Sequence, residues 1–404
     1  MPDPWLIVAG VGEDAPLSRE AEAYIKKAPR VVGGRRLLDK LAPSAAERHI
    51  WPSPLADILP RLHSWRGDLT LILATGDPLL FGVGNFLLRH FAVDEMKILP
   101  AVSSFALARA RLGWGAASAR TLHGRPPDSL RSWLGADLRL LVLPHDGDTP
   151  RVAARILREE GYGRSDIHIL EHMGGDGERI RSLTADELLE KDIDDIAPFH
   201  LLGIHCVADA AATLRSPMTL IDDSRFRHDG QITKSEMRAL ALARLEPYGE
   251  GLLWDLGAGA GSVSVGWLRM APLTRALAIE RDGARVEMVR ENAVRFGVPR
   301  LEVCEEDIDD FLSRAADLPA PDAIFFGGGL STVPRLIERG LNLLSPRGRV
   351  VAHSVTLEGE ETLARAHRDF GGELLRVMVS RAESLGDYRG WRARMPVLQW
   401  YLAR

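Results

Sequence analysis

The chain of 404 residues is longer than one ordinary domain, and its 46% hydrophobic and 26% charged residues are typical of a globular protein. No apolar run approaches the roughly 20 residues that cross a bilayer. The formal net charge is −5, so no overall positive charge indicates a nucleic-acid partner. We therefore expect at least two globular domains that bind neither membrane nor nucleic acid.

Residues at the start of the chain and the two cysteines bear on its location. The N-terminus runs directly into the strand-like segment 5–8 without the basic and apolar regions of a secretion signal, which predicts a cytoplasmic protein. Cys206 and Cys304 lie far apart, each in or beside an apolar run. We therefore expect neither a disulfide framework nor a metal site.

The first half alternates short strand-like runs with helices, a pattern typical of βαβ units around a mostly parallel sheet. The expected strands are Trp5–Ala9, Arg30–Val32, Leu69–Ala74, Arg139–Leu143, Asp166–Leu170 and His200–Cys206. Helices are expected at Leu17–Ala28 and Ser103–Arg111. Small and polar residues then predict a linker at 208–217, which separates a domain of residues 1–207 from one of residues 218–404.

The second half shows an alternation of its own that does not repeat the first. Its expected helices are Lys234–Leu245, Ser262–Met270 and Ala284–Phe296. Its expected strands are Leu252–Leu256, Ala276–Glu280, Leu301–Cys304, Ala323–Phe326, Arg349–Ala352, Leu374–Ser380 and Val397–Leu402. The sequence therefore predicts two unrelated α/β domains in one chain.

Three candidate ligand-binding turns lie in the first half, each where a strand ends and a helix begins. Because such turns meet at one edge of a parallel sheet, they predict a ligand site there. Its candidate residues are Gly10, Gly12, Gly76, Asp77, Pro78, Ser103 and Ser104. The two serines have an alternative role as caps of the helix that follows them.

In their order and sequence these turns resemble the class III tetrapyrrole methyltransferases, which bind S-adenosylmethionine in a cleft between two α/β subdomains. The segments 111–114 (RLGW) and 122–126 (LHGRP) resemble the precorrin carbon-5 branch of that family. The resemblance covers about residues 5–206 and implies cofactor contacts in the three turns. It suggests substrate contacts at His123 and Arg125, with a role in loop structure as the alternative.

One position departs from that family pattern. Glu13 and Asp14 stand where relatives usually carry proline and a third glycine. This departure makes the cofactor affinity of the first turn uncertain. It also leaves open the alternative that the N-terminal half is retained for assembly of the protein rather than for catalysis.

A glycine-rich loop is the sharpest motif of the second half. Asp255, Gly257, Gly259 and Gly261 alternate with single residues directly after a strand and before a helix. Glycines admit a ligand close to the backbone, and a helix N-terminus offers free N–H groups. Glu280 closes the next strand, about 20 residues beyond the loop, where an acidic side chain can bind both ribose hydroxyls. The pattern predicts a nucleoside-containing cofactor rather than a simple strand-to-helix turn.

The spacing narrows the choice of cofactor. It differs from the G-x-G-x-x-G fingerprint of dinucleotide sites, which disfavours a nicotinamide dehydrogenase. The loop resembles the S-adenosylmethionine loop of class I methyltransferases. That resemblance implies an adenine contact at Asp307 with Ile308 beside it, although Asp307 also suits a helix cap.

Further segments narrow the resemblance. The segment 228–234 (HDGQITK) with Glu236 and Arg238, and the segments 325–329, 355–358 and 395–397, resemble the decarboxylating precorrin methyltransferase domain of cobalamin biosynthesis. This resemblance implies a cofactor contact at Thr233. His353 stands where relatives often have asparagine, and both a packing role and a substrate contact are open for it.

The C-terminal tail has a positive charge of its own. Residues 376–404 hold six arginines against Glu383 and Asp387. Guanidinium groups beside an aromatic ring suit a flat ligand that bears carboxylates. The candidate substrate contacts are Arg238, Arg389, Trp391 and Arg392. The alternative is a solvated basic face with Trp391 in the core.

The fused pair resembles the bifunctional precorrin methyltransferases. The resemblance implies methylation of precorrin-6B at carbons 5 and 15 by two S-adenosylmethionine molecules, with decarboxylation of the ring C acetate to give precorrin-8X. It also implies a homo-oligomer, either dimer or tetramer. No side chain is assigned as the acid for decarboxylation. Another corrinoid-pathway tetrapyrrole methyltransferase and an RNA methyltransferase are the alternatives, and the net charge of −5 disfavours the second.

Overall fold

The computed structural model describes residues 4–14, 17–42, 45–116, 118–122, 127–144, 146–191, 193, 195–210, 212 and 221–404. The chain forms two compact units. The N-terminal unit comprises residues 1–127 and 136–213, and the C-terminal unit comprises residues 128–135 and 214–404. Most of the predicted linker at 208–217 lies outside the described residues, so this boundary stays a prediction.

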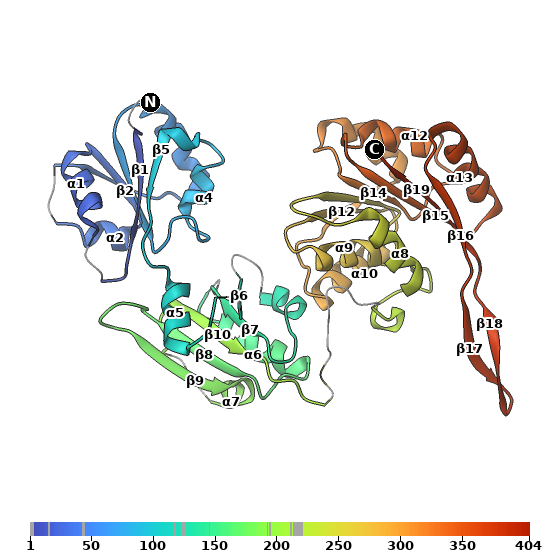
Figure 1. The fold of residues 1–404 in the computed structure, drawn as a ribbon, viewed down its shortest axis with the longest axis horizontal. Helices are drawn as coiled ribbons and strands as arrows, with labels where there is room; N and C mark the ends of the chain where they lie inside the picture. Colours follow the sequence, from blue (N-terminus) through green and yellow to red (C-terminus); the bar gives the residue numbers. More distant parts are fainter. Residues whose placement is uncertain are drawn as a thin grey trace. The chain divides into compact units, whose positions relative to one another are not determined.

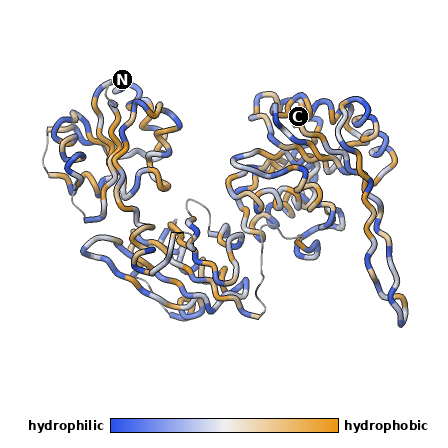
Figure 2. The backbone as a smooth tube through the Cα atoms, viewed as in Figure 1, coloured by the Kyte–Doolittle hydropathy of each residue, from blue (hydrophilic) through white to orange (hydrophobic). Residues whose placement is uncertain are grey.

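The first sheet of the N-terminal unit is wholly parallel, with strand order β3-β2-β4-β1-β5 (Figure 1). Its strands are β1 (Leu6–Val11), β2 (Arg30–Gly33), β3 (Glu47–Ile50), β4 (Thr70–Thr75) and β5 (Met96–Leu99). The helices are α1 (Arg19–Lys27), α2 (Arg35–Asp39), α3 (Leu59–Ser64) and α4 (Val83–Leu87), with 3₁₀ turns η1 (Leu55–Ile58) and η2 (Val93–Glu95). Two apolar clusters involve alternate residues of β1, because successive side chains of a strand point to opposite faces. Figure 2 shows these strands as the hydrophobic centre of the sheet.

The second sheet of this unit is mixed rather than mostly parallel. Its strands are β6 (Ala119–Leu122), β7 (Arg139–Val142), β8 (Asp166–Glu171), β9 (Arg179–Thr184) and β10 (His200–His205), in the order β6-β7-β10-β8-β9. Strand β10 is antiparallel to both of its neighbours. The helices are α5 (Ser104–Leu112), α6 (Thr149–Glu159) and α7 (Ala185–Glu190), with the 3₁₀ turn η3 at Pro127–Ser132. The expected parallel pattern therefore holds for the first sheet only.

The C-terminal unit is a doubly wound sheet with strand order β13-β12-β11-β14-β15-β19-β16. Its strands are β11 (Leu252–Leu256), β12 (Arg275–Glu280), β13 (Glu302–Glu305), β14 (Ala323–Phe326), β15 (Arg349–Ser354), β16 (Glu373–Val377) and β19 (Val397–Ala403). The first five strands in that order are parallel, whereas β19 is antiparallel to both β15 and β16.

Helices cover both faces of this sheet. They are α8 (Ser235–Leu245), α9 (Ser262–Met270), α10 (Gly283–Arg295), α11 (Ile308–Arg314), α12 (Leu336–Leu343) and α13 (Leu357–Phe370), with 3₁₀ turns η4 (Asp223–Arg225) and η5 (Ala315–Asp317). The first three share one apolar cluster with the sheet, and the last three share another. This sandwich leaves the carboxyl ends of the parallel strands open to a ligand.

A two-stranded hairpin, here called the arm, extends from the C-terminal unit (Figure 1). It consists of β17 (Ser380–Leu385) and β18 (Tyr388–Ala393). The expected strand at 374–380 instead ends at Val377, and the arm begins at Ser380. Trp391 is 80% exposed on the arm, so the core position considered for it is wrong. Among the described residues no helix is long and apolar enough to cross a membrane.

Candidate functional site

A cavity of about 730 Å³, here called the C-terminal cavity, lies at the carboxyl edge of the parallel strands of the C-terminal unit. Its walls include Gly257 and Gly259 after β11, Glu280 at the end of β12, residues 327–329 after β14, and His353 near the end of β15. Doubly wound sheets bind their ligands at this edge. The structure thus brings the glycine loop and Glu280 to one site, as their spacing predicts.

The loop conformation explains why glycine is needed here. Gly257 and Gly259 have φ angles of +76° and +58°, which side chains other than glycine rarely adopt. A Cβ atom on Gly257 would lie 2.9 Å from the backbone of Gly328. Glu280 accepts the N–H of Gly259 at 2.9 Å and that of Asp282 at 3.0 Å. This carboxylate therefore shapes the loop while it lines the cavity.

Asp255 and Gly261 support the site from behind rather than from its wall. Asp255 is 1% exposed, and its Oδ2 accepts from both the N–H and the hydroxyl of Ser264 in α9. Its Oδ1 has no hydrogen-bond partner among the described residues. Burial raises the pKa of Asp255 to about 6, although the bonds from Ser264 oppose the shift. Neither residue lines the cavity. Both support the loop and the start of α9, and their direct contact with the cofactor stays a prediction.

The lining also includes Thr233, Asp307 and Ile308. Asp307 caps α11 by accepting from the N–H of Asp309 at 2.9 Å, and it pairs with Arg281 at 3.3 Å. The cap considered for Asp307 is therefore present in addition to its position on the cavity.

Four cationic side chains that were not predicted from the sequence as substrate contacts line the cavity. They are Lys234, Arg281, Arg285 and Arg394. Arg285 pairs with Asp229 at 2.9 Å, and Arg281 with Asp307. Arg394 follows the last residue of the arm and lies 3.9 Å from Glu383. The positive tail was a signal for Arg394, but its charge alone does not show which arginine faces the site.

The other candidate substrate contacts lie away from the C-terminal cavity, so their role stays a prediction. Arg238 is 3% exposed, donates to the carbonyls of Ile221 and Thr233, pairs with Asp223 and packs over the ring of Phe226. Its guanidinium holds the segment before α8 and does not line the cavity. The arm carries Arg389, Trp391 and Arg392, and none of them lines the cavity either.

His353 both packs and lines the cavity. Its Nε2 lies 2.8 Å from Oε1 of Gln399, its cross-strand partner on β19. Its ring meets that of Phe325 edge to face, with centroids 5.1 Å apart. Burial lowers the pKa of His353 to about 4, against the opposing effect of Gln399. The imidazole is therefore neutral at pH 7.

A second cavity of about 340 Å³, here called the N-terminal cavity, lies in the N-terminal unit. Four expected residues line it: Gly76, Asp77, Ser103 and Ser104. Ser103 also caps α5 by accepting from the N–H of Ala106 at 3.1 Å. Residues Gly10, Gly12 and Pro78 do not line it. His123 and Arg125 lie outside the described residues.

Glu13 and Asp14, which depart from the family pattern, anchor the first turn. The buried carboxylate of Glu13 pairs with Arg36, which lines the N-terminal cavity. Asp14 pairs with Lys40 at 2.7 Å and accepts the N–H of Asp176 at 2.9 Å. The two acids thus join this turn to α2 and to the segment that follows β8.

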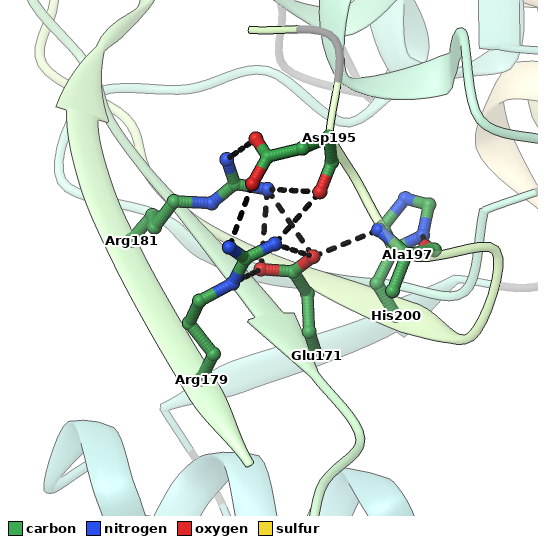
Figure 3. A network of polar contacts seen from close by, with 6 residues as sticks. All are labelled: Glu171, Arg179, Arg181, Asp195, Ala197 and His200. Carbon is green, nitrogen blue, oxygen red and sulfur yellow. Dashed lines mark hydrogen bonds and ion pairs between the residues drawn. The ribbon is translucent and has the colours of Figure 1, made fainter. Parts of the chain in front are cut away.

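An ion cluster around the buried carboxylate of Glu171 lies beside the N-terminal cavity (Figure 3). Glu171 accepts from Arg179 at 2.7 and 2.8 Å, from Arg181 at 3.2 Å and from the N–H of Ala197 at 2.8 Å, while Asp195 pairs with both arginines. Burial favours the neutral acid, but these partners outweigh it and lower the pKa of Glu171. The cluster fixes the segment that leads to His200, which lines the cavity.

These folds define the class of protein. A two-sheet N-terminal unit and a doubly wound C-terminal unit with this glycine loop are those of S-adenosylmethionine-dependent methyltransferases, which confirms the expected fold class. The family description "Tetrapyrrole (Corrin/Porphyrin) Methylases" matches residues 5–189, and "Precorrin methyltransferase domain" matches residues 224–404.

Curated relatives identify the family. The chain is 41% identical over 402 residues to a precorrin-6Y C(5,15)-methyltransferase (decarboxylating) of Sinorhizobium sp., which covers 98% of this chain and 96% of that one. It is 37% identical over 405 residues to the protein of that name from Mycobacterium tuberculosis, covering 99% and 100%. The chain belongs to the precorrin-6Y C(5,15)-methyltransferase (decarboxylating) family. A probable cobalt-precorrin-6B C(15)-methyltransferase (decarboxylating) of Pyrobaculum aerophilum is 36% identical over 173 residues, covering 41% of this chain and 86% of its own.

Proposed function

We propose that this chain methylates precorrin-6B at carbons 5 and 15 and removes the carboxyl group of the ring C acetate as carbon dioxide, giving precorrin-8X. The observation that carries the proposal is the C-terminal cavity, where a glycine loop, an acidic strand end and four cations meet. A site that must hold both a nucleoside and a polycarboxylate needs these groups together. The names of the full-length relatives support the reaction.

The residues of the C-terminal cavity fit S-adenosylmethionine. A Cβ atom on Gly259 would lie no closer than 3.6 Å to its nearest neighbour, Gln231, so the loop leaves room for a ligand beside its backbone. We assign the ribose hydroxyls to Glu280 and the adenine to Asp307 and Ile308, with Thr233 as a further contact. When bound, the cofactor supplies an activated methyl group on a sulfonium.

The protein's own contribution is chiefly positioning. Holding two reactants in an aligned geometry can supply about 7–11 kcal/mol of the barrier. Lys234, Arg281, Arg285 and Arg394 are the groups that can orient the peripheral carboxylates of the tetrapyrrole. We assign carbon 15 and the decarboxylation to this cavity, in line with the precorrin methyltransferase match at residues 224–404.

We assign carbon 5 and a second S-adenosylmethionine to the N-terminal cavity. Gly76 and Asp77 after β4, and Ser103 and Ser104 at the start of α5, would hold this cofactor. Assembly into homo-oligomers and a cytoplasmic location, both expected from the sequence, stay predictions.

The test is product analysis with purified protein, precorrin-6B and S-adenosylmethionine labelled with ¹³C in its methyl group. We expect the full chain to add two methyl groups and release one carbon dioxide. A fragment of residues 218–404 should keep the carbon-15 methylation and the decarboxylation. Methyl transfer to RNA with none to the tetrapyrrole would overturn the proposal.

A further inference from the structure

His353 lies at one end of the C-terminal cavity. Along the carboxyl edge of the sheet the order is β12, β11, β14, β15, which carries Glu280, then the glycine loop, then residues 327–329, then His353. Neighbouring strands are about 4.8 Å apart, so β12 and β15 are separated by about 14 Å. This inference rests on the proposed function, which places the ribose of the cofactor at Glu280. The end of the cavity at β15 then remains for the tetrapyrrole.

The two ring nitrogens of His353 have different surroundings. Nε2 is bonded to Oε1 of Gln399, a residue that is itself buried. A neutral imidazole carries one N–H, and an amide oxygen can only accept it. The proton therefore lies on Nε2, and Nδ1 carries the lone pair.

Nδ1 is available to a ligand. It has no hydrogen-bond partner among the described residues. It is also not fully buried, since it is absent from the set of fully buried side-chain atoms that lack a partner. Because His353 lines the cavity while its Nε2 is directed to β19, Nδ1 opens into the cavity. The site thus presents a neutral acceptor on a ring whose orientation is fixed by Gln399 and Phe325.

We propose that Nδ1 of His353 accepts a hydrogen bond from a ring N–H of the tetrapyrrole and so selects the meso carbon that is methylated. The ionised carboxylates of the substrate are acceptors and cannot bond to this lone pair. The macrocycle's donors are its ring N–H groups, and each ring nitrogen is two bonds from a meso carbon. A ring nitrogen has at most two neighbouring meso carbons, so fixing it limits the reacting carbon to these, and the bond strengthens as positive charge develops on the ring during methyl transfer.

The test uses the full chain with ¹³C-methyl-labelled S-adenosylmethionine, because the two product methyl groups can then be followed separately. In His353→Phe the aromatic ring is kept and the acceptor is lost. We expect kcat/KM for carbon 15 to fall about tenfold, the effect of one hydrogen bond, while carbon-5 methylation is unchanged. In His353→Asn, which restores an acceptor, the rate should recover to within about threefold of the parent.

Further variants separate substrate contact from packing. His353→Phe leaves Gln399 without its partner, so His353→Phe with Gln399→Leu removes both polar groups and should give the same selective loss. Calorimetric binding of S-adenosylhomocysteine to the C-terminal unit should be unchanged in all three variants.

Three results would overturn the inference. These are parental carbon-15 turnover by His353→Phe, failure of the folded His353→Asn variant to recover, and loss of cofactor affinity together with activity. If the parent chain itself methylates no carbon 15, the proposed function fails instead, and the two failures are thereby distinguished.

Discussion

Asp255 is an acid whose burial carries a free-energy cost. Its native pKa of about 6 lies above its ordinary value of 3.8, so between these values the native state binds more protons than the unfolded state. Ionisation of Asp255 therefore lowers the free energy of unfolding as the pH rises through that window, and the free energy stays lower at higher pH.

We therefore expect Asp255→Asn, which cannot ionise, to gain stability relative to the parent as the pH rises from 4 to 7. The gain should be on the order of 3 kcal/mol. Urea unfolding of the residue 218–404 fragment at several pH values measures it. A difference between variant and parent that is constant with pH would contradict the assignment.

Single residues show what motif spacing can predict at a site. Spacing placed Glu280 at a strand end, and the family resemblance placed Asp307 after the next strand; the strand-end rule is enough to bring them to one cavity. It could not place Arg238, because its burial depends on carbonyls and an acid contributed by residues 221–233. Nor could it choose Arg394 over Arg389, since that choice depends on where the arm begins.

At the scale of elements, Gly10 lets the ends of β1, β4 and β5 meet. A Cβ atom there would clash with the carbonyl oxygen of Gly76 and lie 2.7 Å from the N of Ala101. Overpacking of this kind costs about 1–3 kcal/mol. We expect Gly10→Ala to lower the melting temperature of the N-terminal unit and slow carbon-5 methylation, with carbon 15 unaffected.

Gly147→Ala is the matched control for that prediction. Gly147 lies in the same unit, and a Cβ atom there meets nothing within 4 Å. The control should behave like the parent in calorimetry and in the methylation assay. Equal effects of the two substitutions would show that the strand ends tolerate an added methyl group.

Three strands that the sequence failed to predict have a physical reason in common. Strands β3, β6 and β9 are edge strands, and polar residues occupy much of them. An edge strand needs little apolar surface, so alternation of hydrophobic residues does not mark it. Buried central strands are marked clearly: β11 and β14 have the bounds expected from their apolar runs. The arm was missed because its apolar side chains are exposed.

At the scale of the whole molecule, each unit contains a complete cavity. Residues between Gly34 and Leu201 line the N-terminal cavity, and residues between Gly230 and Val397 line the C-terminal one. The apolar clusters are likewise separate. Damage to one cavity should therefore leave the chemistry of the other intact.

Complementation tests this independence. Gly259→Arg places a bulky side chain in the glycine loop of the C-terminal cavity. Asp77→Arg places a bulky side chain in the N-terminal cavity. We expect the first variant to methylate carbon 5 and the second carbon 15, each at the parental rate if its substrate is supplied. An equal mixture should give the doubly methylated, decarboxylated product by ¹³C NMR, because an intermediate released by one chain can be completed by the other. Two singly defective variants that do not complement would show that the intermediate is held within one assembly.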